Sequence, residues 1–238
     1  MISTTNSLTK SSDVFKDLKT LLQKYRSNPW KFPLKDSKAL SRAIDHLIKG
    51  VVREVEKDFS PRAIPTFAIL AVGGYGRREL FPYADVDFVL VHDGKLHPAI
   101  EQLSKKLTYA LLDLKLETGF STLSFKESLK LAKSDFKTSI SLLDARFLCG
   151  SEKFAKKILS QFRLKVLMPF QKRHLNKILK EMKGRHERFG GMIFLGEPHL
   201  KEGLGGLRDL NSIRWMAKIA AEVLSDKQIP RSLTSAKE

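Results

Sequence analysis

The sequence predicts an α+β fold in which a small mixed sheet is flanked by helices and followed by a helical extension. Apolar residues recur at the helical period up to about residue 60, and the pattern then changes to that of short buried strands. Two such strands are expected between residues 66 and 91, and helical patterns dominate from Ser124 onward. The succession of helices, strands and helices gives the fold class.

Two amphipathic helices precede the predicted sheet. The first follows the residues Ser-Ser-Asp and ends near Arg26, and the second begins at about Ser37. Pro61 stops the second helix, because proline has no backbone N–H for a helical hydrogen bond. Residues 27–35 contain two prolines and read as the connector between the helices.

The sheet is expected to contain short strands interrupted by one helix. Thr66–Val72 and Val86–Val91 read as buried strands rich in branched residues, and Lys115–Leu123 as a third strand. Pro98 opens a helix that ends near Leu114, since proline is favoured in the first helical turn.

Helical patterns fill the rest of the chain. Helices are expected over residues 135–149, 152–162, 169–189 and from about Asp209 onward. Gly150 reads as a helix stop, and a glycine-rich loop over residues 190–206 leads into the last helix. We therefore divide the chain into N-terminal helices, a sheet-bearing core and a helical region, over residues 1–60, 61–133 and 134–238.

Composition limits the classes of protein to which the chain can belong. It has 43 Lys and Arg against 26 Asp and Glu, a net charge of +17, which attracts nucleotides, nucleic acid, anionic lipid or acidic proteins. No nucleic-acid recognition motif accompanies this charge, so a nucleic-acid binder is not favoured. The single cysteine, Cys149, fits a reducing compartment, and no apolar run predicts a signal peptide or a membrane span. We expect a cytoplasmic protein.

The segment that carries chemistry is AVGGYGRRELFPYADVDFVLV, residues 71–91. Asp85 and Asp87 open the second strand, and residues two apart on a strand project from the same face. Two neighbouring carboxylates repel each other unless a cation lies between them, and oxygen ligands of this kind suit Mg²⁺. We therefore expect Asp85 and Asp87 to bind magnesium.

The residues before this pair predict a phosphate site. Gly73 and Gly74 lack a Cβ, so their backbone N–H groups can approach a triphosphate closely. Arg77 and Arg78 could add charge-assisted contacts to the same phosphates. A phosphate loop followed by a carboxylate pair on the next strand is typical of a site that transfers a nucleotidyl group. The third glycine of a dinucleotide fingerprint and a Walker loop are both missing, and the pair His92-Asp93 has no metal-binding spacing.

Residues 73–90, GGYGRRELFPYADVDFVL, resemble the signature of the DNA polymerase β-like nucleotidyltransferase superfamily and, more narrowly, of the protein-PII uridylyltransferases. Three later stretches support the narrower resemblance: LLDLKLETGFS at 111–121, SLLDARFLCGSEKF at 141–154 and RHERFGGMIFLGEPHLKEGLGGLRDLNSIRW at 185–215. The resemblance keeps this order from about residue 70 to residue 220, which is difficult to obtain by chance.

The resemblance implies roles for individual residues. Gly73 and Gly74 would hold the phosphates of UTP, and Asp85 and Asp87 would bind Mg²⁺. The superfamily uses a third carboxylate on a neighbouring strand, for which Glu117 is favoured over Asp113. The implied reaction is attack by a tyrosine hydroxyl of a PII-type signalling protein on the α-phosphate of UTP, with release of pyrophosphate.

The chain also departs from the pattern of this family. Ala84 stands where a serine usually precedes the first aspartate, and Leu204 where a proline is common. Family members usually continue into an HD hydrolase domain and two ACT domains, so we do not expect deuridylylation or glutamine sensing from this chain. Two alternatives stay open: a nucleotide-binding regulatory module without turnover, and a nucleotidyltransferase with another donor or acceptor.

Arg208 and Asp209 have two interpretations. Glycines at 203, 205 and 206 allow a tight turn before the last helix, where Asp209 would be the N-cap. In the first interpretation Arg208 stabilises this turn, and in the second it is a wall of the active site. The first is favoured.

Overall fold

The computed structural model describes residues 5–33, 35–60, 63–189 and 199–226. The chain divides into two compact units, residues 1–160 and residues 161–238.

A four-stranded mixed sheet forms the centre of the first unit. Its strands are β1 (Phe67–Ala71), β2 (Phe88–His92), β3 (Phe120–Ser124) and β4 (Arg146–Gly150), in the order β3-β2-β1-β4. β1 pairs antiparallel with β2 and with β4, whereas β2 pairs parallel with β3. The predicted α+β fold with a small mixed sheet is confirmed.

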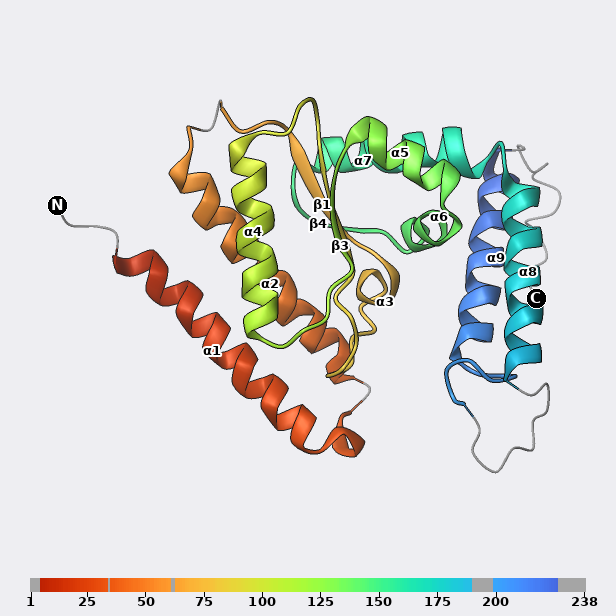
Figure 1. The fold of residues 1–238 in the computed structure, drawn as a ribbon, viewed down its shortest axis with the longest axis horizontal. Coiled ribbons are helices and arrows are strands. Elements are labelled where there is room, and N and C mark those ends of the chain that lie inside the picture. Colours follow the sequence, from red (N-terminus) through yellow and green to blue (C-terminus); the bar gives the residue numbers. More distant parts are fainter. Residues whose placement is uncertain (1–4, 34, 61–62, 190–198, 227–238) are drawn as a thin grey trace, which may run out of the picture. The chain divides into compact units, whose positions relative to one another are not determined.

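Two long helices, α2 (Asp36–Asp58) and α4 (Pro98–Asp113), cover one face of this sheet. α1 (Thr5–Ser27), followed by the short η1 (Pro29–Lys31), packs against α2. Figure 1 shows α2 and α4 lying along the sheet. Apolar residues at helical spacing on α2 are buried against the alternate residues of β1 and β2 that face them. The α2 side of this core consists of Leu40, Ile44, Leu47, Ile48, Val51, Val52 and Val55.

Three shorter helices follow the strands on the other side: α5 (Phe125–Ser134), α6 (Phe136–Leu142) and α7 (Glu152–Phe162). Ala68, Leu70 and Val91 project from the sheet toward this side and pack against Phe154, Ala155 and Ile158 of α7. The sheet is therefore buried on both faces, in agreement with the apolar run of β1.

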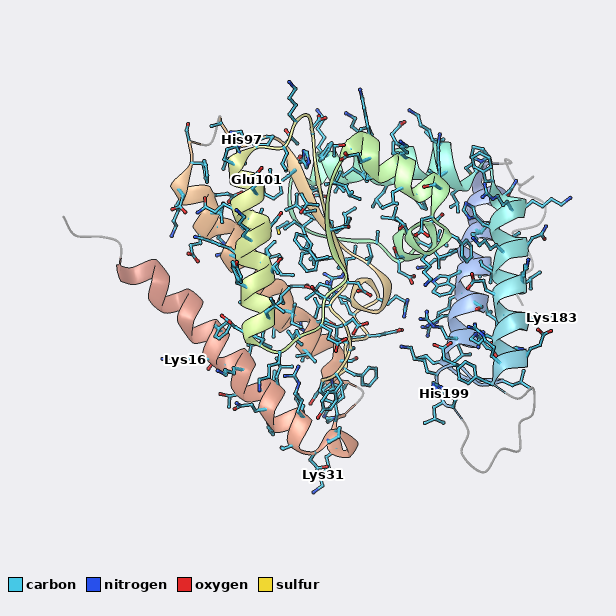
Figure 2. The ribbon with its side chains drawn as sticks, in the orientation of Figure 1. Lys16, Lys31, His97, Glu101, Lys183 and His199 are labelled. Carbon is cyan, nitrogen blue, oxygen red and sulfur yellow. The ribbon has the colours of Figure 1, made fainter. Side chains whose placement is uncertain are left out.

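Helix starts in this unit follow local capping rules. His97, labelled at the start of α4 in Figure 2, accepts a hydrogen bond at Nδ1 from the backbone of Ala99 at 3.1 Å. Ser124 and Glu127 form a capping box at the start of α5, in which each side chain bonds the backbone N–H of the other. The capping box at Ser124 marks the end of β3 and the start of α5.

The second unit contains the π-helix η2 (Arg163–Leu167) and the helices α8 (Gln171–Arg188) and α9 (Leu207–Asp226). α8 and α9 pack side by side (Figure 1). The predicted helical extension is thus present. No helix within the described part of the chain is long and apolar enough to cross a membrane.

The structure corrects several predicted elements. The strand predicted over Lys115–Leu123 is wrong in its first half, because β3 begins at Phe120. β2 begins at Phe88, so Asp85 and Asp87 precede the strand that they were predicted to open.

The helix predicted over residues 135–149 is wrong in its second half, because α6 ends at Leu142 and residues 146–150 form β4. Pairing with β1 overrides the helical pattern there, and Gly150 ends a strand with φ +92°. The first helix also begins earlier than its Ser-Ser-Asp signal predicts, at Thr5. The predicted core limit at residue 133 lies inside the first unit, ahead of β4.

Candidate active site

A tight helical turn, α3 (Gly73–Gly76), follows β1 directly. Gly73 adopts φ +56°, a left-handed conformation that glycine takes without strain. The N–H groups of Gly76 and Arg77 donate to the carbonyls of Val72 and Gly73 at 2.9 and 3.1 Å. The N–H groups of Gly73 and Gly74 belong to the first turn, where a helix offers no internal acceptor.

Asp87 lies next to this turn. Its backbone carbonyl accepts a hydrogen bond from Val72 N at 2.9 Å, which continues the antiparallel pairing of β1 and β2 toward the turn. A Cβ at Gly73 would lie 3.4 Å from Asp87 Oδ2, whereas a Cβ at Gly119 would overlap Oδ1. The Asp87 carboxylate therefore occupies the space that the missing side chains of Gly73 and Gly119 leave open.

The third predicted carboxylate, Glu117, lies in a segment that contacts the residues before β2. Phe88 pairs with Phe120 where both strands begin, so Asp85, Asp87 and Glu117 all precede the strands on which they were predicted. The N–H of Val86, between the two aspartates, donates to Glu117 O at 2.8 Å, which brings the two preceding segments side by side. Asp113, the alternative, ends α4 as an exposed residue.

Asp85 and Asp87 offer carboxylate oxygens, the ligand type that hard divalent cations prefer. Among the described residues, no three His, Cys, Asp or Glu side chains form one metal-binding group. Mg²⁺ usually takes one or two protein carboxylates and completes its six ligands with water and substrate phosphates. Asp85 is exposed and Asp87 is half-buried, which leaves room for such ligands.

The two predicted arginines differ in their surroundings. Arg77 donates to Glu79 at 2.8 Å and to Asp144, whose side chain is fully buried. This pairing favours a structural role for Arg77, since its guanidinium is held by two carboxylates. Arg78 has φ +61°, which is unusual for a residue with a Cβ, and is half-buried at the end of the turn.

Tyr75 of the turn contacts Asp45 and Arg146, two residues outside it. The sequence patterns assign no role to these three residues. Tyr75 is fully buried and its hydroxyl donates to Asp45 Oδ1 at 2.6 Å. Arg146 binds both oxygens of Asp45, at 2.8 and 3.0 Å. Burial first, and then the Asp45 charge, raise the pKa of Tyr75 well above its usual value, so the phenol stays a hydrogen-bond donor. Tyr75 and Arg146 lie within the quoted motifs GGYG and SLLDARFLCG, whereas no quoted motif contains Asp45.

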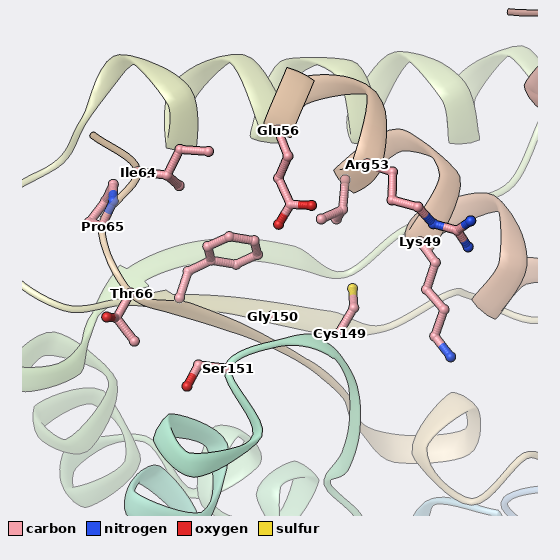
Figure 3. Close-up of a pocket in the computed structure, with 11 residues that line it drawn as sticks. Lys49, Arg53, Glu56, Ile64, Pro65, Thr66, Cys149, Gly150 and Ser151 are labelled. Carbon is pink, nitrogen blue, oxygen red and sulfur yellow. The ribbon is translucent and has the colours of Figure 1, made fainter. Parts of the chain in front are cut away.

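A cavity of about 620 Å³ lies at the other end of β1, between α2, the start of β1 and the end of β4 (Figure 3). Lys49, Arg53 and Glu56 line it from α2, and Cys149 from β4. Burial raises the pKa of Cys149 to about 12, so the thiol is protonated at neutral pH. No predicted site residue lines this cavity, and it is separate from the candidate active site.

In the second unit, Asp209 stabilises the turn before α9. It lies inside the first turn of the helix, so the predicted N-cap position is wrong, but its carboxylate accepts Gly205 N–H at 2.7 Å. Arg185 and His186 of α8 donate to the same carboxylate at 2.6 and 2.8 Å. Burial raises the pKa of Asp209, but these hydrogen bonds outweigh it and leave the pKa below its ordinary value.

Arg208 contacts the same turn. Its Nε lies 3.3 Å from Glu202 Oε1, and Glu202 is also bound through its backbone carbonyl by Arg185 at 3.0 Å. These contacts agree with the favoured interpretation of Arg208 as part of a structural turn.

Comparison with known families agrees with the sequence motifs. Residues 32–122 match the model described as "Putative nucleotidyltransferase DUF294", and residues 173–236 match "GlnD PII-uridylyltransferase". The first match contains the Gly73 turn and all three predicted carboxylates, and the second contains α8, α9 and the turn between them.

Curated relatives named "Bifunctional uridylyltransferase/uridylyl-removing enzyme" match most of the chain. The protein of Phenylobacterium zucineum (strain HLK1) is 40% identical over 151 residues, 63% of this chain and 16% of the relative. That of Ruegeria pomeroyi is 33% identical over 195 residues, 79% of this chain and 21% of the relative. The chain thus spans about a fifth of the length of these relatives. The predicted resemblance to the PII uridylyltransferases is confirmed.

Proposed function

Because the chain matches a nucleotidyltransferase model and a PII-uridylyltransferase model, and its curated relatives are named uridylyltransferases, we propose that it transfers UMP from UTP to a tyrosine of a PII-type protein. In this reaction the tyrosine oxygen forms a bond to the α-phosphorus and gives up its proton. The bond from the α-phosphorus to the bridging oxygen breaks, and pyrophosphate leaves.

The observation that supports this function best is the arrangement of Asp85, Asp87 and Glu117. Asp87 lies against the Gly73 turn, and Val86, between the two aspartates, donates its N–H to Glu117 O at 2.8 Å. A phosphate-binding turn and metal-binding carboxylates must be adjacent, because the metal contacts phosphate oxygens. These two contacts support the proposed arrangement.

Each group then has a chemical role. Backbone N–H groups of Gly73 and Gly74 would donate to the triphosphate and orient it. Asp85 and Asp87 would hold Mg²⁺, which neutralises charge on the transferring phosphoryl group. Glu117 would complete the set of carboxylates.

The test is a titration of the purified chain with UTP and with ATP in magnesium, followed by measurement of pyrophosphate release with a PII protein present. We expect binding of MgUTP and PII-dependent release of pyrophosphate. Tighter binding of ATP, with transfer of AMP, would replace the donor but keep the nucleotidyltransferase assignment. Absence of nucleotide binding would contradict the proposal.

A second candidate is a nucleotide-binding regulatory module without turnover. Ala84 favours it, because the serine hydroxyl that usually precedes the first aspartate in the resembled family is missing. This candidate would be supported if the chain binds MgUTP without releasing pyrophosphate and if Ala84→Ser restores pyrophosphate release.

A further inference from the structure

We propose that Asp45 and Arg146 are positioning residues that hold the Gly73–Gly76 turn in the shape that receives the nucleotide phosphates. The inference rests on the proposed function, because it concerns the same site. Asp45 lies on α2 and Arg146 on β4, so two elements far apart in the sequence fix one turn.

Arg146 connects the turn to α2 through its whole guanidinium group. Nε and Nη2 donate to the backbone carbonyls of Gly76 and Tyr75, both at 3.3 Å. Nη1 and Nη2 donate to the two oxygens of Asp45. A planar guanidinium presents donors along more than one edge, so one side chain can bind a carboxylate and two carbonyls. The single nitrogen of a lysine cannot repeat this geometry.

Asp45 fixes a side chain of the turn as well as the arginine. It is 6% exposed and accepts the Tyr75 hydroxyl on Oδ1, the oxygen that also accepts Arg146 Nη2. The Tyr75 ring lies 5.3 Å below the guanidinium. The turn is therefore held through its backbone by Arg146 and through its one large side chain by Asp45.

The residues just before Arg146 contact the turn at a second point. A Cβ at Gly76 would overlap the carbonyl oxygen of Asp144, so this position needs glycine. The Asp144 side chain in turn binds Arg77. The start of β4 is thus packed directly against the turn, and a shift of Arg146 would move it.

The position of the turn matters for chemistry because Asp87 lies against it. A Cβ at Gly73 would lie 3.4 Å from Asp87 Oδ2, in van der Waals contact, so the turn and the predicted metal ligand are close neighbours. A misplacement of about 1 Å in a site can cost about 100-fold in rate. A buried ion pair adds little net stability compared with apolar residues of the same volume, so its effect here is on geometry.

The experiment compares Arg146→Lys and Asp45→Asn with a matched control. Lys106→Met on α4 removes an ion pair to Glu54 of α2, the helix that carries Asp45, at 2.9 Å. We expect the two test variants to bind MgUTP at least tenfold more weakly, by titration calorimetry. Amide hydrogen exchange at Gly76 and Arg77, whose N–H groups close the turn, should accelerate by at least the same factor. The control should change neither quantity more than twofold.

The two readouts separate the inference from the proposed function. If Arg146→Lys and Asp45→Asn have the same exchange rates, MgUTP affinities and melting temperature as the Lys106→Met control, the inference is overturned. The proposed function stays intact in that case, provided that the unmodified chain binds MgUTP. A wild-type chain that fails to bind MgUTP would contradict the function, and the exchange rates would still decide whether the two residues hold the turn. If Asp45→Asn does not fold, Tyr75→Phe removes one bond to Asp45 and repeats the test.

Discussion

At the scale of single residues, the candidate site is organised around Asp87. Its backbone continues the sheet to Val72, and its carboxylate fills the space beside two glycines. Gly119 is the last residue of the motif Asp-x-Lys-Leu-Glu-x-Gly, and the structure explains why no side chain fits there. Gly119 of this motif and Asp87 of the segment GGYGRRELFPYADVDFVL therefore pack against each other.

The carboxylate pair gives the first prediction. Asp85→Asn and Asp87→Asn should each remove nearly all pyrophosphate release, because an amide is a poor ligand for Mg²⁺. The melting temperature should stay the same or rise slightly, since a like-charge repulsion is lost. Calorimetry and a coupled pyrophosphate assay measure both effects. Near-wild-type turnover in either variant would contradict the assignment of the site.

Gly119→Ala tests the packing around Asp87. The added Cβ would overlap Asp87 Oδ1, so the carboxylate must move, and we expect at least a tenfold loss of kcat/KM, about 1.4 kcal/mol. Gly50→Ala on α2 is the matched control, because nothing lies within 4 Å of its Cβ position. Unchanged kinetics in Gly119→Ala would show that Asp87 tolerates displacement.

Local patterns predicted the acidic and glycine residues of the candidate site, but not the residues that hold the Gly73–Gly76 turn. Asp85 and Asp87 are two residues apart in one short motif, so the sequence alone pairs them, although both precede β2 in the structure. Asp45 and Arg146 are 101 residues apart, and their contact depends on how α2 and β4 pack. No periodicity records such a pair, which is why the sequence did not reveal the residues that hold the turn.

At the scale of elements, strands with branched apolar runs and helices with clear periodicity were predicted well. β1, β2, α4 and α7 lie within about two residues of their predicted bounds. β4 was missed because its five residues become a strand through pairing with β1, and their own pattern does not specify it. A strand that forms only because it pairs with another strand has no local pattern from which a single sequence can predict it.

The turn before α9 gives the third prediction. Arg208→Ala removes a partly exposed pair with Glu202, and such pairs contribute roughly 0.2–1 kcal/mol, so the melting temperature should fall slightly. Kinetics per folded molecule should remain nearly unchanged. An unshifted melting temperature with a tenfold or larger kinetic loss would instead identify Arg208 as a substrate contact.

Asp209 gives a prediction about pH. Its folded pKa is lowered, so its contribution to stability is present above the unfolded pKa, near 3.9, and is lost as the pH falls through the folded value. Asp209→Asn should therefore lower the melting temperature at pH 7, and the difference from wild type should shrink below about pH 4. Trp215 fluorescence in a Trp30→Phe background follows this unit. A difference that is constant with pH would contradict the ion-pair role.

At the scale of the whole molecule, the predicted site residues and the PII-uridylyltransferase match lie in different units. Every predicted nucleotide and metal residue lies within residues 1–160, whereas the match to the PII-uridylyltransferase model covers residues 173–236. The first unit therefore holds the residues that we assign to the nucleotide, and the second contains the segment that matches the PII-uridylyltransferase model.

This division predicts the behaviour of a shortened chain. A protein that ends at Phe162 keeps α7 whole and contains Gly73, Gly74 and the three carboxylates. We expect it to bind MgUTP within about threefold of the full chain, since the phosphate turn, the metal ligands and the Asp45–Arg146 pair are all retained. PII-dependent pyrophosphate release should fall much more, if the second unit contributes to recognition of the acceptor. Circular dichroism and the melting temperature establish that the shortened chain is folded. A folded shortened chain that binds MgUTP more than tenfold weaker would mean that the second unit supplies nucleotide contacts, and Arg208 would be the first residue to test.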